Sequence, residues 1–459
     1  MRGRVGRMIA ASAAAGLLAL AGTPGARAQD ETGAKLQAAA AWRAMGAGDC
    51  PAVVEGAERM LAAPDVGQVY PSMWLLAVSS GAQCAVRLER MDEAERLTGL
   101  LLARDEAASF LEPPLAGAFA GIIAEAAQSV RTAPFALALI GKAETARKAG
   151  KGGHAVAMGA NMAFVDHAAA LTLTGRTDDA RALIATIGAP KQRLFIAIDS
   201  RFAPLWSSPE AAAAEIVALT QVAAEREPDV GISMPGALAW PLLALGRNDE
   251  ALALSLRLLG PRPEGFGTYV DAGDERYALT LALIALGRID EAWSIARVHP
   301  TAGDTHEAAR VAAVVLALVR ADRPDDARSL LLEWRKVRRP YGESDLPDLA
   351  ACIDTRLGQP AAGQAAPDGY LDLDTQLSAK LCAGREDDTA AFVIHMLEST
   401  GRDGMLAALQ HYRAPKLLGA FDAELRRRRL ALLARPDVGA AVARQGRILD
   451  LELYRAPFN

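Results

Sequence analysis

Aromatic residues and cysteines are both scarce in this 459-residue chain. Phe, Trp and Tyr together make up 5% of the sequence. Surfaces that stack on sugars or on nucleic-acid bases rely on aromatic side chains, so the composition argues against both kinds of surface. The four cysteines, Cys50, Cys84, Cys352 and Cys382, contain no C-x-x-C pair. This spacing argues against a structural zinc site.

The chain also lacks a long apolar run and an excess of positive charge. Beyond residue 28, no segment reaches the roughly 18 consecutive apolar residues of a transmembrane helix, and the longest run, Val311–Val319, is closed by an arginine at each end. The formal net charge is −5, which leaves no basic footprint for nucleic acid and little attraction to anionic lipid. The sequence therefore predicts neither an integral membrane segment nor a nucleic-acid partner.

The N-terminus has the pattern of a secretory signal. Three arginines lie within the first seven residues, Met8–Leu20 is a short apolar stretch, and Ala26 and Ala28 stand at positions −3 and −1 of a cleavage point. We predict that residues 1–28 are removed, which takes away four arginines and changes the net charge from −5 to −9. The residue directly after the cleavage point is not a cysteine, so we do not expect a lipoprotein. The segment is bacterial in style, so we expect the mature protein in the periplasm.

One short motif, Arg-x-Asp-[Asp/Glu]-Ala-x-x-[Leu/Ile], occurs five times. Its copies begin at Arg90, Arg176, Arg247, Arg288 and Arg323. In three copies a glycine precedes the arginine, and glycine ends a helix well because it adopts left-handed dihedral angles. We expect the arginine to interact with the free carbonyls at that helix end, and the acids to cap and charge the start of the next helix. The motif alanine lets the two helices approach closely. The pattern predicts a repeated helix–turn–helix hairpin.

These turns resemble those of a known repeat family. Leu245–Ala251 (LGRNDEA) and Leu286–Ala292 (LGRIDEA) are similar to the inter-helix turn of the tetratricopeptide repeat (TPR) family. The resemblance implies an all-α, right-handed α-solenoid. Together with weaker copies, the anchor alanines are Ala52, Ala94, Ala136, Ala180, Ala212, Ala251, Ala292, Ala327, Ala362 and Ala390, with a mean spacing near 37.6 residues. We expect about nine to ten hairpins over residues 29–400, and a helical cap and tail over residues 401–459.

The cysteines fit the repeat register. An even number of cysteines in an exported chain indicates disulfides. Relative to the anchor alanines, all four are expected near the same edge of the stack, and neighbours in sequence are neighbours in space in a solenoid. The register therefore predicts the pairs Cys50–Cys84 and Cys352–Cys382. The sequence leaves open whether both form.

We find no motif for catalysis, a metal or a cofactor. The six histidines form no H-E-x-x-H helix, and no G-x-S-x-G or complete phosphate loop occurs. Asp368, Asp372 and Asp374 lack the spacing of a calcium loop and indicate a polar loop. Arg426–Arg429 suggests the solvated face of a terminal helix. The sequence predicts no cofactor, and we expect no enzymatic activity.

The inner helices suggest where a partner would bind. The first helices of the hairpins are apolar nearly all round, so they either form a buried layer or line a groove. For a groove, the candidates are Trp240, Tyr277, Leu281 and Leu316, by analogy with where TPR proteins hold peptides. The favoured function is a non-catalytic periplasmic scaffold or adaptor that binds envelope proteins through a TPR-like concave surface.

An alternative function comes from a different class. The same hairpins can close into an α/α toroid that acts as an enzyme or a small-molecule binder with a central cavity. Clustered buried carboxylates or histidines in such a cavity favour this alternative. An open groove lined by Trp240 and Tyr277 favours the scaffold.

Overall fold

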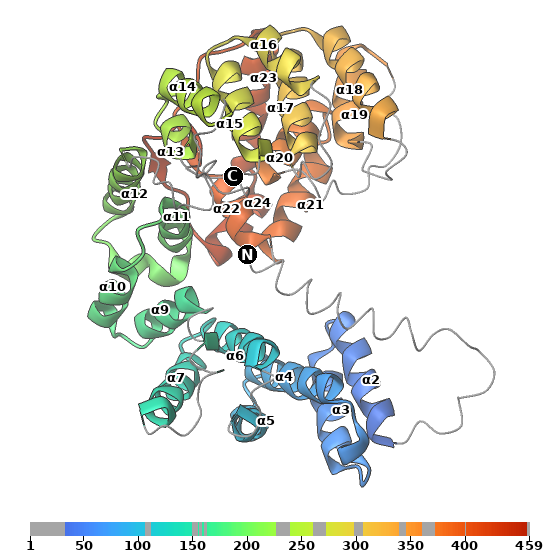
Figure 1. The fold of residues 1–459 in the computed structure, drawn as a ribbon, viewed down its shortest axis with the longest axis vertical. Coiled ribbons are helices and arrows are strands. Elements are labelled where there is room, and N and C mark those ends of the chain that lie inside the picture. Colours follow the sequence, from blue (N-terminus) through green and yellow to red (C-terminus); the bar gives the residue numbers. More distant parts are fainter. Residues whose placement is uncertain are drawn as a thin grey trace, which may run out of the picture. The chain divides into compact units, whose positions relative to one another are not determined.

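The computed structural model describes residues 33–105, 112–148, 163–225, 239–259, 272–297, 306–338, 346–359, 372–399 and 401–456, together with residues 155, 158 and 159. Within these ranges the chain is helical apart from turns, 3₁₀ segments and two short strands (Figure 1). The prediction of an all-α protein is confirmed. The predicted signal peptide, residues 1–28, lies outside the described residues. None of the described helices has both the length and the apolar character needed to cross a bilayer.

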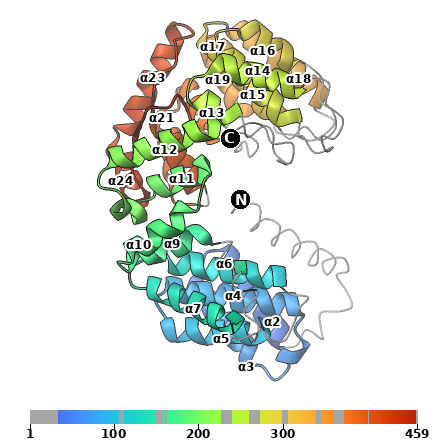
Figure 2. The same ribbon diagram turned by 60° about the vertical axis from the view of Figure 1, so that its left-hand side comes forward.

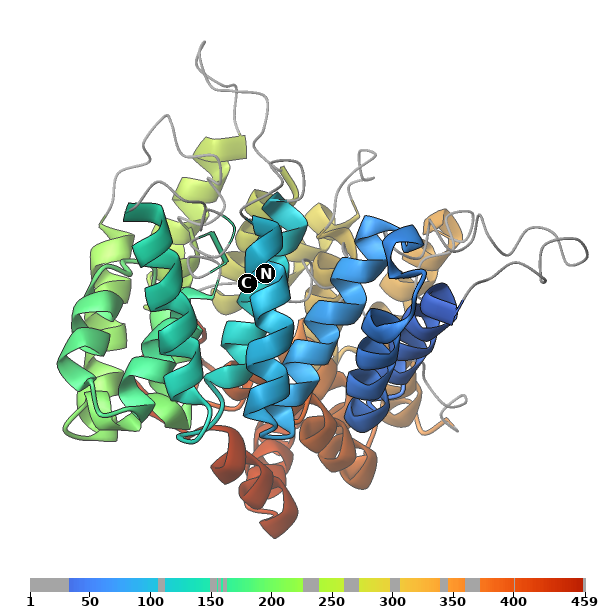
Figure 3. The same ribbon diagram turned by 90° about the horizontal axis from the view of Figure 1, so that it is seen from below.

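The chain divides into two compact units, Met1–Thr186 and Ile187–Asn459. In the first unit, successive helices pack on one another in chain order, and Figure 3 shows them side by side. Its elements are α2 (Gly33–Gly46), α3 (Cys50–Ala62), the 3₁₀ helix η1 (Val66–Gln68), α4 (Pro71–Arg87), α5 (Met91–Asp105), α6 (Glu112–Ala126), α7 (Ala133–Lys148), α9 (Phe164–Leu173) and α10 (Thr177–Ala185).

In the second unit, more residues separate one hairpin from the next. Its first helices contact one another in chain order, α13 with α15, α15 with α17 and α17 with α19. Its elements are α11 (Pro190–Ile198), η3 (Ser200–Leu205), α12 (Pro209–Ala224), α13 (Ala239–Ala244), α14 (Asn248–Leu259), α15 (Ala272–Ala285), α16 (Ile289–Ala296), α17 (Glu307–Arg320), α18 (Pro324–Arg338), α19 (Pro347–Arg356), α20 (Leu373–Cys382), α21 (Glu386–Leu397), α22 (Arg402–Ala408), β1 (His411–Tyr412), α23 (Ala420–Leu433), α24 (Pro436–Gln445) and β2 (Asp450–Leu451).

The hairpin turns share one hydrogen-bond pattern. At Gly246, φ is +74°, and the next N–H, of Arg247, bonds to the carbonyl of Leu242 at 2.9 Å. This six-to-one bond, with a left-handed residue before it, is the Schellman motif that satisfies carbonyls at a helix end. The same bond joins the backbone N–H of the motif arginine to the carbonyl five residues earlier in all five copies, which are Arg90, Arg176, Arg247, Arg288 and Arg323.

Four of the five motif arginines, Arg176, Arg247, Arg288 and Arg323, bond through their side chains to the acid three residues later, and not to the carbonyls as expected. Arg288 Nε and Nη2 each donate to a carboxylate oxygen of Glu291 at 2.6 Å. Arg288 is itself the N-cap residue of α16 and makes no side-chain cap, so the acids Asp290 and Glu291 are the second and third residues of the helix. There the carboxylates complement the positive end of the helix dipole and hold the guanidinium across the turn. The backbone Schellman bonds already satisfy the carbonyls, which leaves the arginine free to make this contact.

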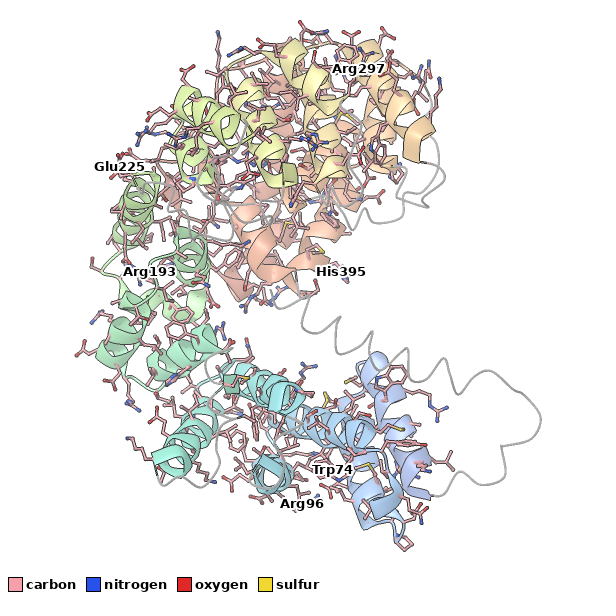
Figure 4. The ribbon with its side chains drawn as sticks, in the orientation of Figure 1. Trp74, Arg96, Arg193, Glu225, Arg297 and His395 are labelled. Atoms are coloured by element: carbon pink, nitrogen blue, oxygen red, sulfur yellow. A yellow bond between two sulfur atoms is a disulfide. The ribbon has the colours of Figure 1, made fainter. Side chains whose placement is uncertain are left out.

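The anchor alanines are buried where the motif is strong. Ala94, Ala180, Ala251, Ala292 and Ala327 are all 0% exposed. Of the weaker anchors, Ala362 lies outside the described residues. Exposed ion pairs link neighbouring hairpins on the outside of the second unit, as between Arg297 of α16 and Glu333 of α18 at 2.8 Å (Figure 4). Such exposed pairs contribute little stability each, so the buried alanine contacts hold the hairpins together.

Two disulfides join neighbouring elements, and they are the pairs that the repeat register predicts. Cys50 is bonded to Cys84 and links α3 to α4 in the first unit. Cys352 is bonded to Cys382 and links α19 to α20 in the second. Each bond therefore ties one helix to a helix of the next hairpin.

The second unit closes on itself through its C-terminal segment. Three leucines of this segment, Leu449, Leu451 and Leu453, are 0–3% exposed. Its backbone reaches the first helices of the unit, because Arg447 N–H bonds to the carbonyl of Ile198 at 2.8 Å and Tyr454 N–H to the carbonyl of Ala244 at 2.7 Å. Figure 2 shows the C-terminal helices beside α11 and α12.

Buried charges reinforce this closure. Asp199, which follows α11, is 2% exposed. Its carboxylate accepts hydrogen bonds from Arg201, and Arg402 of α22 lies 3.2 Å away. Burial alone would raise the pKa of Asp199, but Arg201 and Arg402 together hold that pKa below its usual value. A buried carboxylate paired in this way fixes where the end of the unit meets its beginning.

Candidate functional site

The four predicted groove residues lie inside the second unit and do not line an open surface. Trp240 is 4% exposed, Tyr277 1% and Leu316 7%, and Leu281 is partly buried against the same hydrophobic core. They come from α13, α15 and α17, the inner row of helices. The sequence therefore placed them on the correct helices, but the C-terminal segment and neighbouring helices cover them.

Trp240 and Tyr277 form an aromatic pair. Their ring centroids are 5.5 Å apart and the rings meet edge to face at 67°, a favourable arrangement for aromatic quadrupoles. His306, the N-cap residue of α17, stacks on Tyr277 with the ring centroids 6.1 Å apart. The guanidinium of Arg455 lies 4.9 Å from the Trp240 centroid. Arg455 belongs to the C-terminal segment, so the closure of the unit also covers this pair.

Next to the aromatic pair lies a charged edge formed by the start of α20. Asp372 is the N-cap residue of this helix and accepts hydrogen bonds from Thr375 N–H at 2.9 Å and Thr375 Oγ1 at 2.8 Å. The Tyr277 hydroxyl donates to Asp372 Oδ2 at 3.1 Å. Two residues on, Asp374 pairs with Arg429 of α23 at 2.6 Å. The aromatic pair is thus joined to the first turn of α20 by a hydrogen bond.

The carboxylate of Asp374 is accessible to solvent, although many other groups of the protein lie close to it. Its side chain is 57% exposed, whereas that of Arg429 is 26% exposed. The surrounding protein would raise the pKa of Asp374, but Arg429, and less strongly Arg455 and Arg320, lower it below its usual value. The carboxylate is therefore ionised at neutral pH. It faces solvent and has arginines from two other helices and the C-terminal segment around it.

The two tyrosines of this region are neutral. Burial raises the pKa of Tyr277 well above its ordinary value, and the negative charge of Asp372 adds to the shift. Burial also raises the pKa of Tyr412 in β1, and Asp374 contributes. The Tyr412 hydroxyl donates to the carbonyl of Ala407 at 2.8 Å. The phenols thus serve as hydrogen-bond donors.

More buried charge surrounds the inner helices. Glu275 of α15 is 1% exposed, and Glu307 and Arg310 of α17 are 4% and 0% exposed. Fully buried Glu and Arg side chains are rare unless they are paired. The interior of the second unit therefore combines aromatic rings with acids and arginines. In the described part of the chain, no group of three or more His, Cys, Asp or Glu side chains is arranged to hold a metal ion.

Sequence reasoning missed the charged half of this site for identifiable reasons. Asp372 and Asp374 lie in a stretch without the repeat motif and were assigned to a polar loop. Arg429 belongs to a run of four arginines that suggests a solvated face, but three of the four bond within the unit: Arg426 to Asp422, Arg428 to Glu424 and Arg429 to Asp374. The N-cap pattern Asp372-Leu-Asp-Thr375 was the available signal.

No protein-family model matches the chain, and a search of curated proteins finds no match.

Proposed function

We propose that this chain is an exported, non-catalytic binding protein built from TPR-like hairpins, and that its second unit binds a small polar molecule. One observation carries the proposal: Asp374 is 57% exposed yet sits among Arg429, Arg455 and Arg320. Its exposure leaves room for a second partner.

The charges suggest the kind of ligand. Asp374 offers an ionised carboxylate, and Arg455 and Arg429 offer guanidinium groups. A small zwitterion such as an amino acid fits this set, because its ammonium group pairs with Asp374 and its carboxylate with an arginine.

The test is a calorimetric titration of the full chain with a panel of amino acids, with neutral amides as comparison ligands. We expect binding of one or more zwitterions, weakened about 10- to 100-fold by Asp374→Asn, as for the loss of a charge-assisted hydrogen bond. Asp388→Asn is the matched control, because Asp388 is an exposed acid in the first turn of α21. The proposal is wrong if no zwitterion binds, or if both variants weaken binding equally.

A protein scaffold is the second candidate function. The hairpin turns share one geometry along both units, as in TPR proteins that hold other proteins. The first unit exposes Tyr70 (57%) and Leu36 (45%), and Lys35 lies over the Tyr70 ring at 5.4 Å, which places these residues near one another. We expect any envelope partner to bind at the surface of Leu36 and Tyr70. Trp240 and Tyr277 are unsuitable for a binding test, because a charge substituted for either would disrupt the core.

Crosslinking in an envelope extract tests this candidate. Specific proteins captured by the wild type should be lost with Leu36→Ser/Tyr70→Ser and retained with Val130→Ser, a control residue that is 64% exposed in the same unit. If all variants retain the captured proteins, this surface is excluded as the binding site.

N-terminal sequencing of the secreted form tests export, and the expected first residue is Gln29. The two disulfides support export, because such bonds persist in oxidising compartments.

A further inference from the structure

The two disulfides have different surroundings. Cys50 is 5% exposed and Cys84 8%, whereas Cys352 and Cys382 are 0% and 1% exposed. The first bond also borders a small cavity of about 70 Å³, lined by Met45, Gly48, Cys50, Ser80, Gln83, Cys84 and Arg87. One water occupies about 30 Å³ of liquid, so the cavity admits a group about the size of the CH₂–SH end of a small thiol. A small reagent therefore has better access to the first bond than to the second.

The surroundings of Cys50 stabilise a thiolate. Arg87 Nη1 lies 3.9 Å from Cys50 Sγ. The other side of the guanidinium is fixed, because its Nε and Nη2 donate to the carboxylate of Glu125 at 2.9 and 2.7 Å. Cys50 is also the first residue of α3. A helix N-terminus and a nearby arginine both lower the pKa of a thiol.

Two acids oppose this effect but do not cancel it. Glu125 offsets part of the charge of Arg87, and Asp49 is the N-cap residue of α3, with its carboxylate turned to Ala52 N–H at 3.2 Å. The guanidinium nitrogen that faces Cys50 is the one that does not bond Glu125. By contrast, Cys382 is the last residue of α20, where the helix dipole disfavours a negative charge, and it is buried among apolar residues.

We propose that the Cys50–Cys84 bond is a thiol–disulfide exchange site for small thiols, with Cys50 as the leaving group. The thiolate of a small thiol attacks Sγ of Cys84. The disulfide breaks, and its electron pair leaves on Cys50 Sγ beside Arg87. A second thiolate then attacks the sulfur of the small thiol in the mixed disulfide, and Cys84 leaves as a thiolate that takes a proton from water. Two small thiols are oxidised to one disulfide, and one protein disulfide is reduced to two thiols.

This chemistry changes the link between two helices. The bond ties the first residue of α3 to α4, so its reduction removes the disulfide cross-link between the hairpin of α2 and α3 and the hairpin of α4 and α5, which the backbone still connects. The Cys352–Cys382 bond keeps its link under the same conditions. The first unit thus carries a reversible link and the second a permanent one.

The first test uses the intact chain and reduced glutathione as the probe. After timed incubation, free thiols are alkylated and the cysteine peptides are quantified by mass spectrometry. We expect Cys50–Cys84 to be reduced at least about tenfold faster than Cys352–Cys382, because a lower-pKa leaving thiol and better access both speed the exchange. Equal rates, or faster reduction of Cys352–Cys382, would overturn the proposal.

A second test isolates the role of Arg87. Arg87→Met should slow the reduction of Cys50–Cys84 several-fold, whereas Arg131→Met should not. Arg131 is an exposed arginine of the same unit that pairs with Glu89 at 2.8 Å. In the reduced wild-type protein, the pH profile of alkylation should give Cys50 a midpoint below the ordinary thiol value of about 8.5 and below that of Cys84. A midpoint for Cys50 at or above that of Cys84 would contradict the assignment even if the Arg87 variant failed to fold.

Discussion

Leu453→Ala tests the closure of the second unit. Leu453 is 0% exposed and belongs to the hydrophobic core that contains Trp240 and Leu242. Truncation of a fully buried leucine to alanine loses the transfer free energy of the removed atoms and leaves a cavity, at a cost of about 2–5 kcal/mol. For a unit of this size, each kcal/mol lowers the unfolding midpoint by about 2–4 °C. We therefore expect the midpoint of the second unit to fall by about 4–20 °C.

The assay must report on each unit separately, because a chain with two units need not unfold in one step. Hydrogen exchange measured by mass spectrometry does this. Peptides from α12 and α13 should lose protection in Leu453→Ala, whereas peptides from α3 and α4 should not. Leu430→Ala is the control, since Leu430 is 61% exposed on α23 and its loss should change stability by less than about 0.5 kcal/mol. If Leu453→Ala and Leu430→Ala behave alike, the C-terminal segment does not hold the unit closed.

Two further predictions concern charge and backbone. The pKa of Asp199 is lowered in the folded state, so its stabilising contribution is complete above the unfolded value of about 3.9 and is lost as the pH falls through the folded value. Asp199→Asn should lower the free energy of unfolding by about 3–5 kcal/mol at pH 7. In urea titrations from pH 6 to pH 2, the difference in this free energy between wild type and variant should shrink as the pH falls. A difference that stays constant would refute the prediction. Gly287→Ala should cost about 1–2 kcal/mol, because its φ of +75° strains a residue with a Cβ. Gly439→Ala, inside α24 with open space around it, should instead be neutral or stabilising by up to about 1 kcal/mol, and thermal unfolding of the two variants distinguishes these outcomes.

The hairpins were predictable because their information is local. A glycine, an arginine and an acid within a few residues specify the turn, and the buried alanine specifies the packing. Even so, two turns use a non-glycine residue in the left-handed region, Glu89 with φ +56° and Asp322 with φ +58°. Asp322 Oδ2 accepts a hydrogen bond from Ala420 N–H at 2.9 Å. The repeat pattern cannot reveal this contact, since its partner is 98 residues away in the sequence.

Only those parts of the site that belong to the local repeat could be predicted from the sequence. Trp240 and Tyr277 lie in the first helices of successive hairpins, so the repeat places their helices side by side, but they stand 11 and 15 residues before their anchor alanines, so the register does not give their contact. The residues that complete the site belong to segments without a repeat: Asp372, Asp374, Arg429 and Arg455. Their positions depend on where the C-terminal segment returns, and no local pattern encodes that return. The residues predicted for the groove lie on α13, α15 and α17 and are largely buried, and their role in binding stays a prediction.

The closure of the second unit also constrains when this protein can fold. Arg447 Nε donates to the carbonyl of Ala197 across 250 residues of sequence. During synthesis, α11 and α12 emerge long before the segment that covers them. Until residues 447–456 arrive, the apolar surface that these residues later bury stays open to other chains and to holding chaperones. Loops of this length close slowly, so the second unit should be the last part of the chain to gain protection.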